Sequence, residues 1–367
     1  MSIPPVISAD SHVSEPGDLW VERLDRKYRD DAPRVVRNEK AAAPWVFVGP
    51  GIHPLTVAGV FAAGRSGNEL REHMKHGYEA ARPSGWDPVE RLKDQDLDGI
   101  AAEVLYSSLG IVLLNMQNPE LQRACLRVYN DWLAEFCAHS PRRLIGIGLY
   151  PLSALPDVSE IERCARQGLK GILILASDAI QKPYSDPSFD PLWRVCAEHG
   201  LPISLHKPLV SGMTLTPAMP TMADLQINVI HVVEQCITRL VYGGVFERFP
   251  NLKIVSAEND VGWIPNWVHR LDHVHSKMAF SRQLPRRPSE YVRQNVWATF
   301  QDDPLGAATW RFFGADNYMW ASDFPHADST FPNSRKVIEE NFDGVPDEVT
   351  RRITFDNVNR LYAIGLN

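Results

Sequence analysis

The stretch VISADSHVSEP at Val6–Pro16 is the part of the sequence that decides the fold. An apolar, β-prone run leads into Asp10 and His12 and stops at Pro16, which predicts a short buried strand whose end carries two polar side chains. Side chains two residues apart on a strand face the same side. A carboxylate and an imidazole at this spacing can bind one divalent cation, although an Asp and a His that only cap a loop would give the same pattern.

Apolar runs of the same kind recur along the rest of the chain and alternate with helical segments. The predicted later strands cover 100–107, 144–150, 171–176, 202–206, 252–258, 296–300 and 318–323. The predicted helical segments cover 89–97, 118–139, 158–167, 191–199, 222–249, 263–280 and 304–313. Eight strands of near-continuous apolar character predict an α/β fold, a (β/α)8 TIM barrel, rather than an open sheet.

Residues 17–90 do not follow this alternation. They are rich in Pro, Gly, Ala and Arg, which predicts a long insertion after the first strand with only short elements of its own. Long loops in compact enzymes usually cover a site, so we expect the insertion to cover the active site of a single domain spanning residues 1–367. Its basic residues either line a substrate pocket or belong to a solvated loop: Arg65, Arg71, His73, His76 and Arg82.

Composition narrows the class of protein. The 367 residues carry a net charge of −7 without a long basic block, which argues against nucleic acid or an anionic membrane as the main partner. The sequence shows neither a signal-peptide pattern nor an apolar stretch long enough for a membrane span, so a cytoplasmic protein is expected. The five cysteines form no C-x-x-C pair and are expected to be reduced packing residues.

Ionisable side chains close four of the predicted strands. Asp10 and His12 end the first strand, His206 the fifth, Glu258 the sixth and Asp323 the eighth. Barrel enzymes place their active sites at the C-terminal ends of the strands, so these five side chains should meet. Burying them would be costly without a cation or hydrogen-bond partners, which favours a divalent metal site. The histidines that fall within or at the ends of helices are expected to be structural or exposed: His139, His199, His231, His269, His273 and His275.

Five motifs resemble the amidohydrolase superfamily, and more closely its amidohydrolase-2 branch of aminocarboxymuconate semialdehyde decarboxylase-like enzymes. The motifs are DSH at Asp10–His12, DPVERLKDQDLDG at Asp87–Gly99, LPISLH at Leu201–His206, SAEND at Ser256–Asp260 and WASDFPH at Trp320–His326. The resemblance runs over nearly the whole chain outside the insertion. Its motifs are specific to the branch and not to a substrate.

The resemblance implies a metal centre with one ion. By it, the ligands are Asp10, His12, His206 and Asp323, and the ion is expected to be zinc, with manganese as the other candidate. Binuclear members of the superfamily use a carbamylated lysine at the end of strand 4. This chain has the sequence LAS at Leu175–Ser177 there, so a mononuclear centre is implied. Glu258 is a departure, because decarboxylases of the branch typically have a histidine at that position.

Two reactions follow for such a centre, with Asp323, Glu258 and His206 as the catalytic residues. In the first, an aromatic or conjugated carboxylic acid loses carbon dioxide after Asp323 or Glu258 delivers a proton to carbon. In the second, metal-activated water hydrolyses an amide, lactone or ester, Asp323 accepts the proton and Glu258 protonates the leaving group. Family association favours decarboxylation. A barrel that only serves as a scaffold is the non-enzymatic alternative.

Four further residues are candidates for supporting roles. His326 either orients the substrate, bonds to Glu258 or stabilises the loop after Pro325. Arg65 and Trp86 are candidates for substrate binding, and Trp86 alternatively packs the insertion onto the barrel. Glu15 either braces His12 or simply begins the next loop. The expected partner is a small-molecule substrate, and members of the branch are often dimers, so a homodimer is expected.

Overall fold

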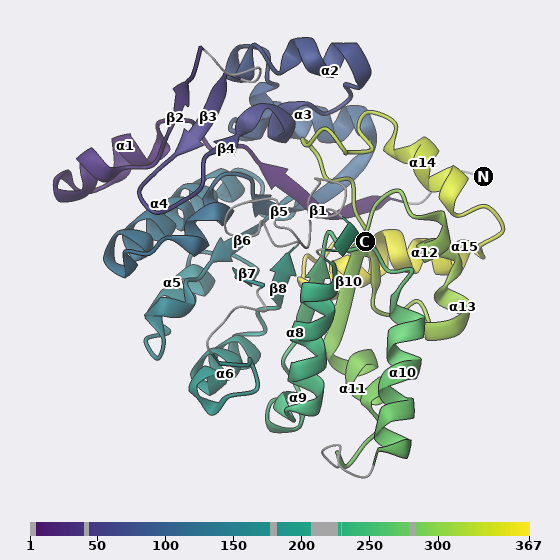
Figure 1. The fold of residues 1–367 in the computed structure, drawn as a ribbon. Helices are drawn as coiled ribbons and strands as arrows, with labels where there is room; N and C mark the ends of the chain where they lie inside the picture. The colour runs from purple at the N-terminus through teal and green to yellow at the C-terminus, as the bar shows by residue number, and fades with distance from the viewer. Residues whose placement is uncertain (1–4, 40–43, 177–181, 207–226, 229, 279–283) are drawn as a thin grey trace.

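The strands predicted from the sequence form one parallel sheet that curls into a barrel (Figure 1). The computed structural model describes the chain except residues 1–4, 40–43, 177–181, 207–226, 229 and 279–283. Within that described part, the sheet has eight strands in the order β1-β5-β6-β7-β8-β9-β10-β11. The predicted (β/α)8 TIM barrel, with its long insertion after the first strand, is therefore confirmed.

All eight strands are almost entirely buried, which is why each reads as an apolar run. Their bounds are β1 Val6–Val13, β5 Ile100–Ser107, β6 Leu144–Leu149, β7 Gly171–Ile174, β8 Ile203–His206, β9 Ile254–Ala257, β10 Val296–Phe300 and β11 Tyr318–Trp320. Four strands end earlier than predicted: β6, β7, β9 and β11. Glu258 and Asp323, which were predicted to end strands, each have a φ of 58° and so are not extended. Both carboxylates therefore lie on turns that follow β9 and β11.

The barrel closes where β1 meets the segment Trp320–Phe324, and we call this contact the seam. Across it, the amide of Asp323 donates to the carbonyl of Asp10 (2.9 Å), and the amide of His12 donates to the carbonyl of Phe324 (2.6 Å). Beneath them, the hydroxyl groups of three buried serines lie 2.9–3.1 Å from one another: Ser8, Ser11 and Ser322. The segments that close the barrel are thus the segments that carry Asp10, His12 and Asp323.

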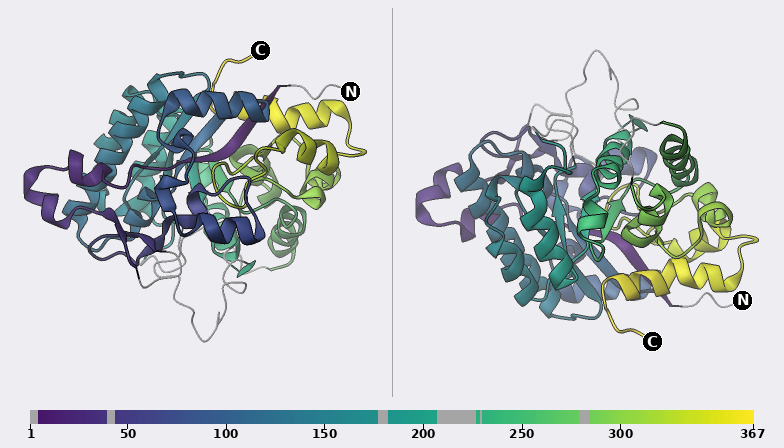
Figure 2. Two further views of the ribbon diagram at one scale, coloured as in Figure 1. Left: turned by 90° about the horizontal axis from the view of Figure 1, so that it is seen from above. Right: turned by 90° about the horizontal axis from the view of Figure 1, so that it is seen from below.

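Helices lie around the sheet when the molecule is seen from above and from below (Figure 2). Their bounds are α3 Pro88–Asp98, α4 Pro119–Ala138, α5 Ser159–Arg166, α6 Asp190–His199, α8 Ile230–Tyr242, α9 Val245–Arg248, α10 Ile264–Lys277, α11 Pro288–Asn295, α12 Pro304–Ala308, α13 Trp310–Phe313, α14 Ser334–Asn341, α15 Asp347–Arg351 and α16 Asn357–Leu361. The helical region predicted at 222–249 is partly outside the described residues; its remainder breaks into α8 and α9 at Gly244, whose φ is 67°. The helices α11 and α14 to α16 were not predicted.

The insertion contains only short elements of its own, as its sequence predicts. It contains α1 Leu19–Arg23, α2 Gly67–His73 and an antiparallel sheet of β2 Arg34–Arg37, β3 Trp45–Val48 and β4 Leu55–Thr56. Trp20 fixes this unit to the barrel, because its ring packs 5.1 Å from that of Phe47 and its indole donates to the carbonyl of Cys125 on α4. The insertion is thus a small packed unit at one side of the barrel (Figure 2).

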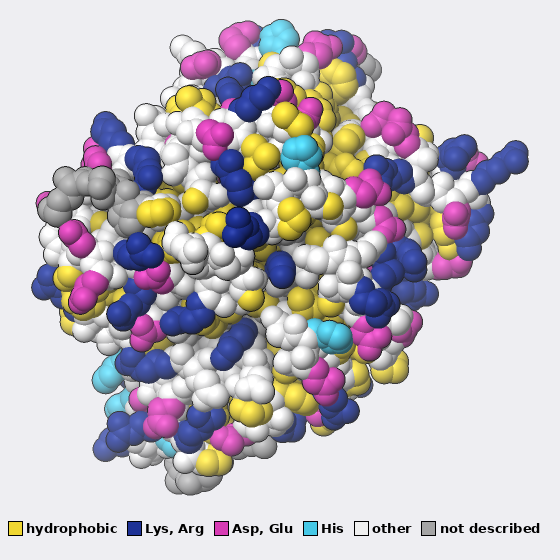
Figure 3. All heavy atoms as spheres, turned by 180° about the vertical axis from the view of Figure 1, so that it is seen from behind, with side chains coloured by type: hydrophobic (Ala, Val, Ile, Leu, Met, Phe, Trp, Pro, Cys, Tyr) yellow, Lys and Arg dark blue, Asp and Glu magenta, His cyan; other side chains and the backbone are white. Residues whose placement is uncertain are grey.

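The surface and the core agree with the expectations from composition. Basic and acidic side chains are interspersed on the face shown in Figure 3. All five cysteines are buried and carry free thiols. Among the helices of the described residues, none combines the length and the apolar character that crossing a bilayer requires.

Asp98, at the end of α3, provides a stability prediction. It is buried and accepts a hydrogen bond from the amide of Ser334 (3.0 Å), yet burial raises its pKa from 3.8 to about 6. A carboxyl whose pKa is raised by folding stabilises the protein below pH 4, and that contribution is lost as the pH rises through 6. In Asp98→Asn, the fall in unfolding free energy between pH 4 and pH 7 should be smaller than in wild type by about 2 to 3 kcal/mol.

Chemical denaturation at several pH values measures this difference. Asp96→Asn is the matched control, because Asp96 lies on the same helix but is exposed. The dependence of its unfolding free energy on pH should be the same as in wild type. Parallel profiles for wild type and Asp98→Asn would show that the prediction is wrong.

Candidate metal centre

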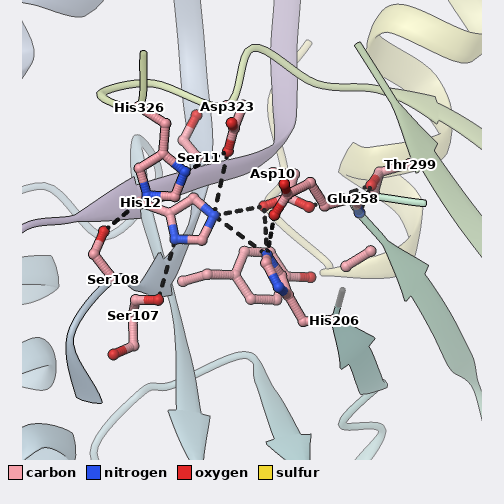
Figure 4. A network of polar contacts seen from close by, with 12 residues as sticks. Asp10, Ser11, His12, Ser107, Ser108, His206, Glu258, Thr299, Asp323 and His326 are labelled. Carbon is pink, nitrogen blue, oxygen red and sulfur yellow. Dashed lines mark hydrogen bonds and ion pairs between the residues drawn. The ribbon is translucent and has the colours of Figure 1, made fainter. Parts of the chain in front are cut away.

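Four strands bring the predicted polar side chains together at the C-terminal end of the barrel (Figure 4). Asp10 and His12 come from β1, and His206 is the last residue of β8. Glu258 follows β9 directly, and Asp323 follows β11 by three residues. The left-handed turns at Glu258 and Asp323 are strained for residues other than glycine, and such strain is characteristic of functional sites.

His12 Nε2 is the common neighbour of the other three side chains that the family resemblance names as ligands. It lies 3.5 Å from Asp10 Oδ1, 3.3 Å from Asp323 Oδ1 and 3.3 Å from His206 Nε2. His206 Nε2 is in turn 3.8 Å from Asp10 Oδ1 and 3.2 Å from Glu258 Oε2. The structure thus brings together all five residues that the strand ends predicted.

The donor atoms of this cluster fit a divalent cation. The Oδ1 atoms of Asp10 and Asp323 are buried and accept no well-aligned hydrogen bond from any described residue, although imidazole nitrogens lie 3.1–3.8 Å away. Such orphaned carboxylate oxygens are costly unless they coordinate a cation. Together with the ring nitrogens of His12 and His206, they offer the oxygen and nitrogen donors that zinc and manganese accept.

His326 lies closer to these donors than the sequence analysis assumed. Its Nδ1 is 3.1 Å from Asp323 Oδ1, and its ring lies 4.0 Å from that of His12. The donor atoms of His12, Asp323 and His326 all lie within 4.8 Å of one another, so His326 is a candidate ligand as well as a candidate for substrate binding. Its Nε2 is 3.0 Å from the hydroxyl of Ser108, which fixes the orientation of the ring. In the sequence, the spacing of three residues between Asp323 and His326 was the pattern that could have indicated this closeness.

Hydrogen bonds behind the cluster orient His12 and Asp10. His12 Nδ1 lies 3.1 Å from the carbonyl of Ser107, which leaves Nε2 to face the other donors. The hydroxyl of Thr299 donates to Asp10 Oδ2 (3.3 Å) and accepts from the amide of Glu258 (2.9 Å). The sequence analysis missed Thr299, although a lone polar residue in an otherwise apolar strand is a usable signal.

Glu15 acts on a loop and not directly on His12. Its buried carboxylate accepts hydrogen bonds from the amides of Leu109 (2.8 Å) and Gly110 (3.1 Å) and from the hydroxyl of Ser107. Burial raises the pKa of Glu15, and these hydrogen bonds oppose that rise. Any bracing of His12 by Glu15 therefore passes through Ser107, whose carbonyl faces the His12 ring.

Burial and the neighbouring charges shift the pKa values of the side chains in the cluster. Burial, assisted by His326 and His206, lowers the pKa of His12 well below 6.5, so His12 is neutral and ready to act as a ligand. Burial alone would also lower the pKa of His206, but the nearby carboxylates, Asp10 foremost, outweigh it and raise that pKa to about 9. Burial likewise raises the pKa of Asp10, against the opposing effect of His206. A bound cation would replace the positive charge of His206.

Arg65 and Trp86 contact other residues of the insertion, whereas Arg82 contacts α3. Arg65 donates to the carbonyl of Ala80 (3.3 Å), and the ring of Trp86 lies 5.5 Å from that of Tyr78. Arg82 forms an ion pair with Asp94 on α3. Substrate binding by Arg65 or Trp86 stays a prediction.

Comparison with known proteins points to one family. The family description amidohydrolase matches residues 52–364. A segment of 194 residues is 28% identical to 2-amino-3-carboxymuconate-6-semialdehyde decarboxylase of Dictyostelium discoideum, over 51% of this chain and 52% of that protein. A segment of 304 residues is 28% identical to gamma-resorcylate decarboxylase of a Polaromonas species, over 75% of this chain and 87% of that protein. The match thus spans about half the length of the first relative and most of the second.

Solved structures share the fold. An amidohydrolase from Mycobacterium avium subsp. paratuberculosis superposes with a TM-score of 0.81 at 23% identity, over 98% of this chain and 99% of that one. The 5-carboxyvanillate decarboxylase of Novosphingobium aromaticivorans, solved with manganese and 4-hydroxy-3-methoxy-5-nitrobenzoic acid, superposes with a TM-score of 0.68 at 19% identity, over 98% and 96%. Both show the same barrel architecture.

Proposed function

The chain belongs to the amidohydrolase family, and on that basis we propose that it is a metal-dependent decarboxylase of an aromatic or conjugated carboxylic acid. The observation that carries the proposal is the set of donors on Asp10, His12, His206 and Asp323, two of which are orphaned buried oxygens. The two relatives that the comparison names are decarboxylases, which supports this reaction over others of the family.

The proposed cofactor is one divalent cation. The sequence led to zinc as the first expectation, but the comparisons do not favour zinc, since the related decarboxylase structure contains manganese. A cation held by the four ligands would supply a Lewis acid for the substrate carboxylate and a neighbouring oxygen. Manganese and zinc therefore both enter the test.

The residues of the chain supply the proton. Glu258 is the best-placed donor, because its side chain is 18% exposed and adjoins His206, whereas that of Asp323 is 2% exposed and serves as a ligand. In the proposed reaction, a carboxyl proton adds to the ring carbon, the bond from that carbon to the carboxylate breaks, and carbon dioxide leaves. His326, 17% exposed beside Asp323, lies where it can orient the substrate.

We also propose that residues 1–367 form one domain in which the insertion covers the site. The insertion bonds to the loop that carries His326, since Ala63 donates to the carbonyl of Pro325 (3.0 Å) and Ala327 donates to that of Gly59 (2.8 Å). These bonds support one domain over residues 1–367 in which the insertion covers the site. The expected small-molecule substrate, homodimer and cytoplasmic location belong to the same proposal.

Glu258 also favours a second candidate, hydrolysis of an amide, lactone or ester. A carboxyl group stands where decarboxylases of the branch typically have a histidine, and a carboxylic acid can protonate a leaving group. Decarboxylation and hydrolysis can be separated by their products.

Metal analysis combined with product detection tests both candidates. The purified protein should contain, or take up, about one equivalent of manganese or zinc. The loaded protein should then release carbon dioxide from at least one member of a panel of hydroxybenzoic acids. Hydrolysis of esters, lactones or amides without release of carbon dioxide would favour the second candidate. Failure to bind either metal would contradict both.

A further inference from the structure

The helix α3 is packed with its polar side inward. Its buried residues are Arg91, Asp94, Gln95 and Asp98, whereas Val89 is 46% exposed and Leu97 is 63% exposed. This inverted helix is the second motif of the family resemblance, and the ligand set makes no use of it. Arg91 is the most unusual member, since it is 0% exposed and arginine is rarely fully buried unless it is paired.

The guanidinium of Arg91 reaches both sides of the seam. Its Nη1 donates to the carbonyl of His12 (2.7 Å), and its Nη2 approaches the carbonyl of Phe324 (3.4 Å). Its Cζ also lies 4.6 Å from the centre of the Phe324 ring. His12 is a proposed ligand and Phe324 directly follows the ligand Asp323. One side chain therefore holds the main chain of both segments that supply the donors.

A buried carboxylate fixes the guanidinium in this place. Arg91 Nε donates to Glu103 Oε2 on β5 (2.6 Å), and Gln95 donates to the same oxygen (2.7 Å). The charge of Arg91 is thus neutralised, and its planar fork leaves two nitrogens for the two carbonyls. A lysine at this position has one nitrogen and cannot make the three bonds in the same geometry.

We propose that Arg91 is a positioning residue of the metal centre. By holding the carbonyls of His12 and Phe324, it sets the separation of His12 Nε2 and Asp323 Oδ1, which is 3.3 Å. The inference rests on the proposed function, because it presumes that a cation binds between these donors. It assigns a role in the metal centre to the motif at Asp87–Gly99, which forms α3.

Arg143 provides a matched control. It binds the same kinds of groups, since it donates to the carbonyls of Ala101 (3.1 Å) and Ile100 (3.4 Å) and to Asp96 on α3 (2.6 Å). These carbonyls lie at the N-terminal end of β5, whereas the metal centre lies at the C-terminal ends of the strands. Loss of Arg143 should therefore reduce stability without changing the donors.

The experiment measures metal affinity and metal geometry in wild type, Arg91→Lys, Arg91→Met and Arg143→Met. Apo protein is titrated with Mn²⁺, and the absorption spectrum of the Co²⁺-substituted protein is recorded. Arg91→Met should bind Mn²⁺ about 10- to 100-fold more weakly than wild type. This is the usual loss of metal affinity when a residue that orients a metal ligand is replaced. The Co²⁺ absorption bands of Arg91→Met should also shift. Arg91→Lys should lie between wild type and Arg91→Met in Mn²⁺ affinity and in Co²⁺ spectrum. Arg143→Met should match wild type in both measurements.

The outcomes separate this inference from the proposed function. Wild-type protein that binds neither Mn²⁺ nor Co²⁺ would contradict the proposed function itself. Wild-type protein that binds metal, together with a folded Arg91→Lys of unchanged affinity and unchanged Co²⁺ spectrum, would overturn the role of Arg91 alone. If Arg91→Met does not fold, Arg91→Lys decides. Equal losses of affinity in the Arg91 variants and Arg143→Met would mean that Arg91 only stabilises the fold.

Discussion

Asp323→Asn is expected to remove nearly all activity, with a fall in kcat of about a thousandfold or more. The substitution keeps the shape of the side chain but removes the negative charge of a buried oxygen that lies 3.3 Å from His12 Nε2 and 3.1 Å from His326 Nδ1. On the proposed ligand set, a bound cation would lose an anionic ligand, so Mn²⁺ should also bind at least about a hundredfold more weakly. Asparagine tolerates the left-handed φ of 58° at this position, so the fold should be retained.

Asp328→Asn is the control for this prediction. Asp328 lies on the same loop but is exposed, and its substitution should leave both kcat and metal affinity at wild-type values. Steady-state kinetics with the best substrate of the panel, together with Mn²⁺ titration, gives both quantities. An Asp323→Asn enzyme that kept a tenth or more of its activity would rule out Asp323 as a ligand of the reacting centre.

Glu258→Gln should separate catalysis from metal binding. Glu258 is the proposed proton donor and lies outside the proposed ligand set, so Gln should lower kcat by about a hundred- to ten-thousandfold while the affinity for Mn²⁺ changes little. The amide preserves the size of the side chain next to His206, 3.2 Å away, but has no carboxyl proton to deliver.

The neighbouring Asp260→Asn tests whether any charge change in this turn has the same effect. Asp260 shares the left-handed conformation, with a φ of 52°, but its side chain is exposed, so its kcat should stay near wild type. Equal losses in both variants would mean that the turn, and not the carboxyl of Glu258, controls the rate. A Glu258→Gln enzyme that lost metal would place Glu258 among the ligands.

The barrel could be predicted because its strands are buried on both faces. Burial on both faces produces the continuous apolar runs that end in Asp10, His206 and the other site residues, and parallel strands then bring those ends together. The four ligands were named from the family resemblance, and the geometry of the strand ends explains why they meet. The apolar runs therefore predicted where the site lies, and the family resemblance predicted which residues are its ligands.

Other parts of the site were not predictable from patterns in one sequence. Helix α3 reads as an ordinary amphipathic helix, but tertiary contacts turn its polar side toward the barrel, and Arg91 was missed for that reason. The strands of the insertion have two to four residues each, too few for a period to be recognised. The contact of Ser108 with His326 joins segments far apart in the chain, which no local pattern records.

The seam has a consequence for how the protein is made. Asp10 lies on the first strand of the barrel and Asp323 follows the last, so a nascent chain exposes one half of the centre long before the other half exists. At bacterial or eukaryotic rates of translation, the interval is roughly a quarter of a minute to a minute. Until Asp323 and the strand before it have been synthesised, the edge of β1 that later meets them is unpaired. Chaperones can bind this edge, and non-native strands can pair with it. On the proposed ligand set, an ion could be held by both carboxylates only after Asp323 has been added, so a shorter chain would lack a complete metal centre.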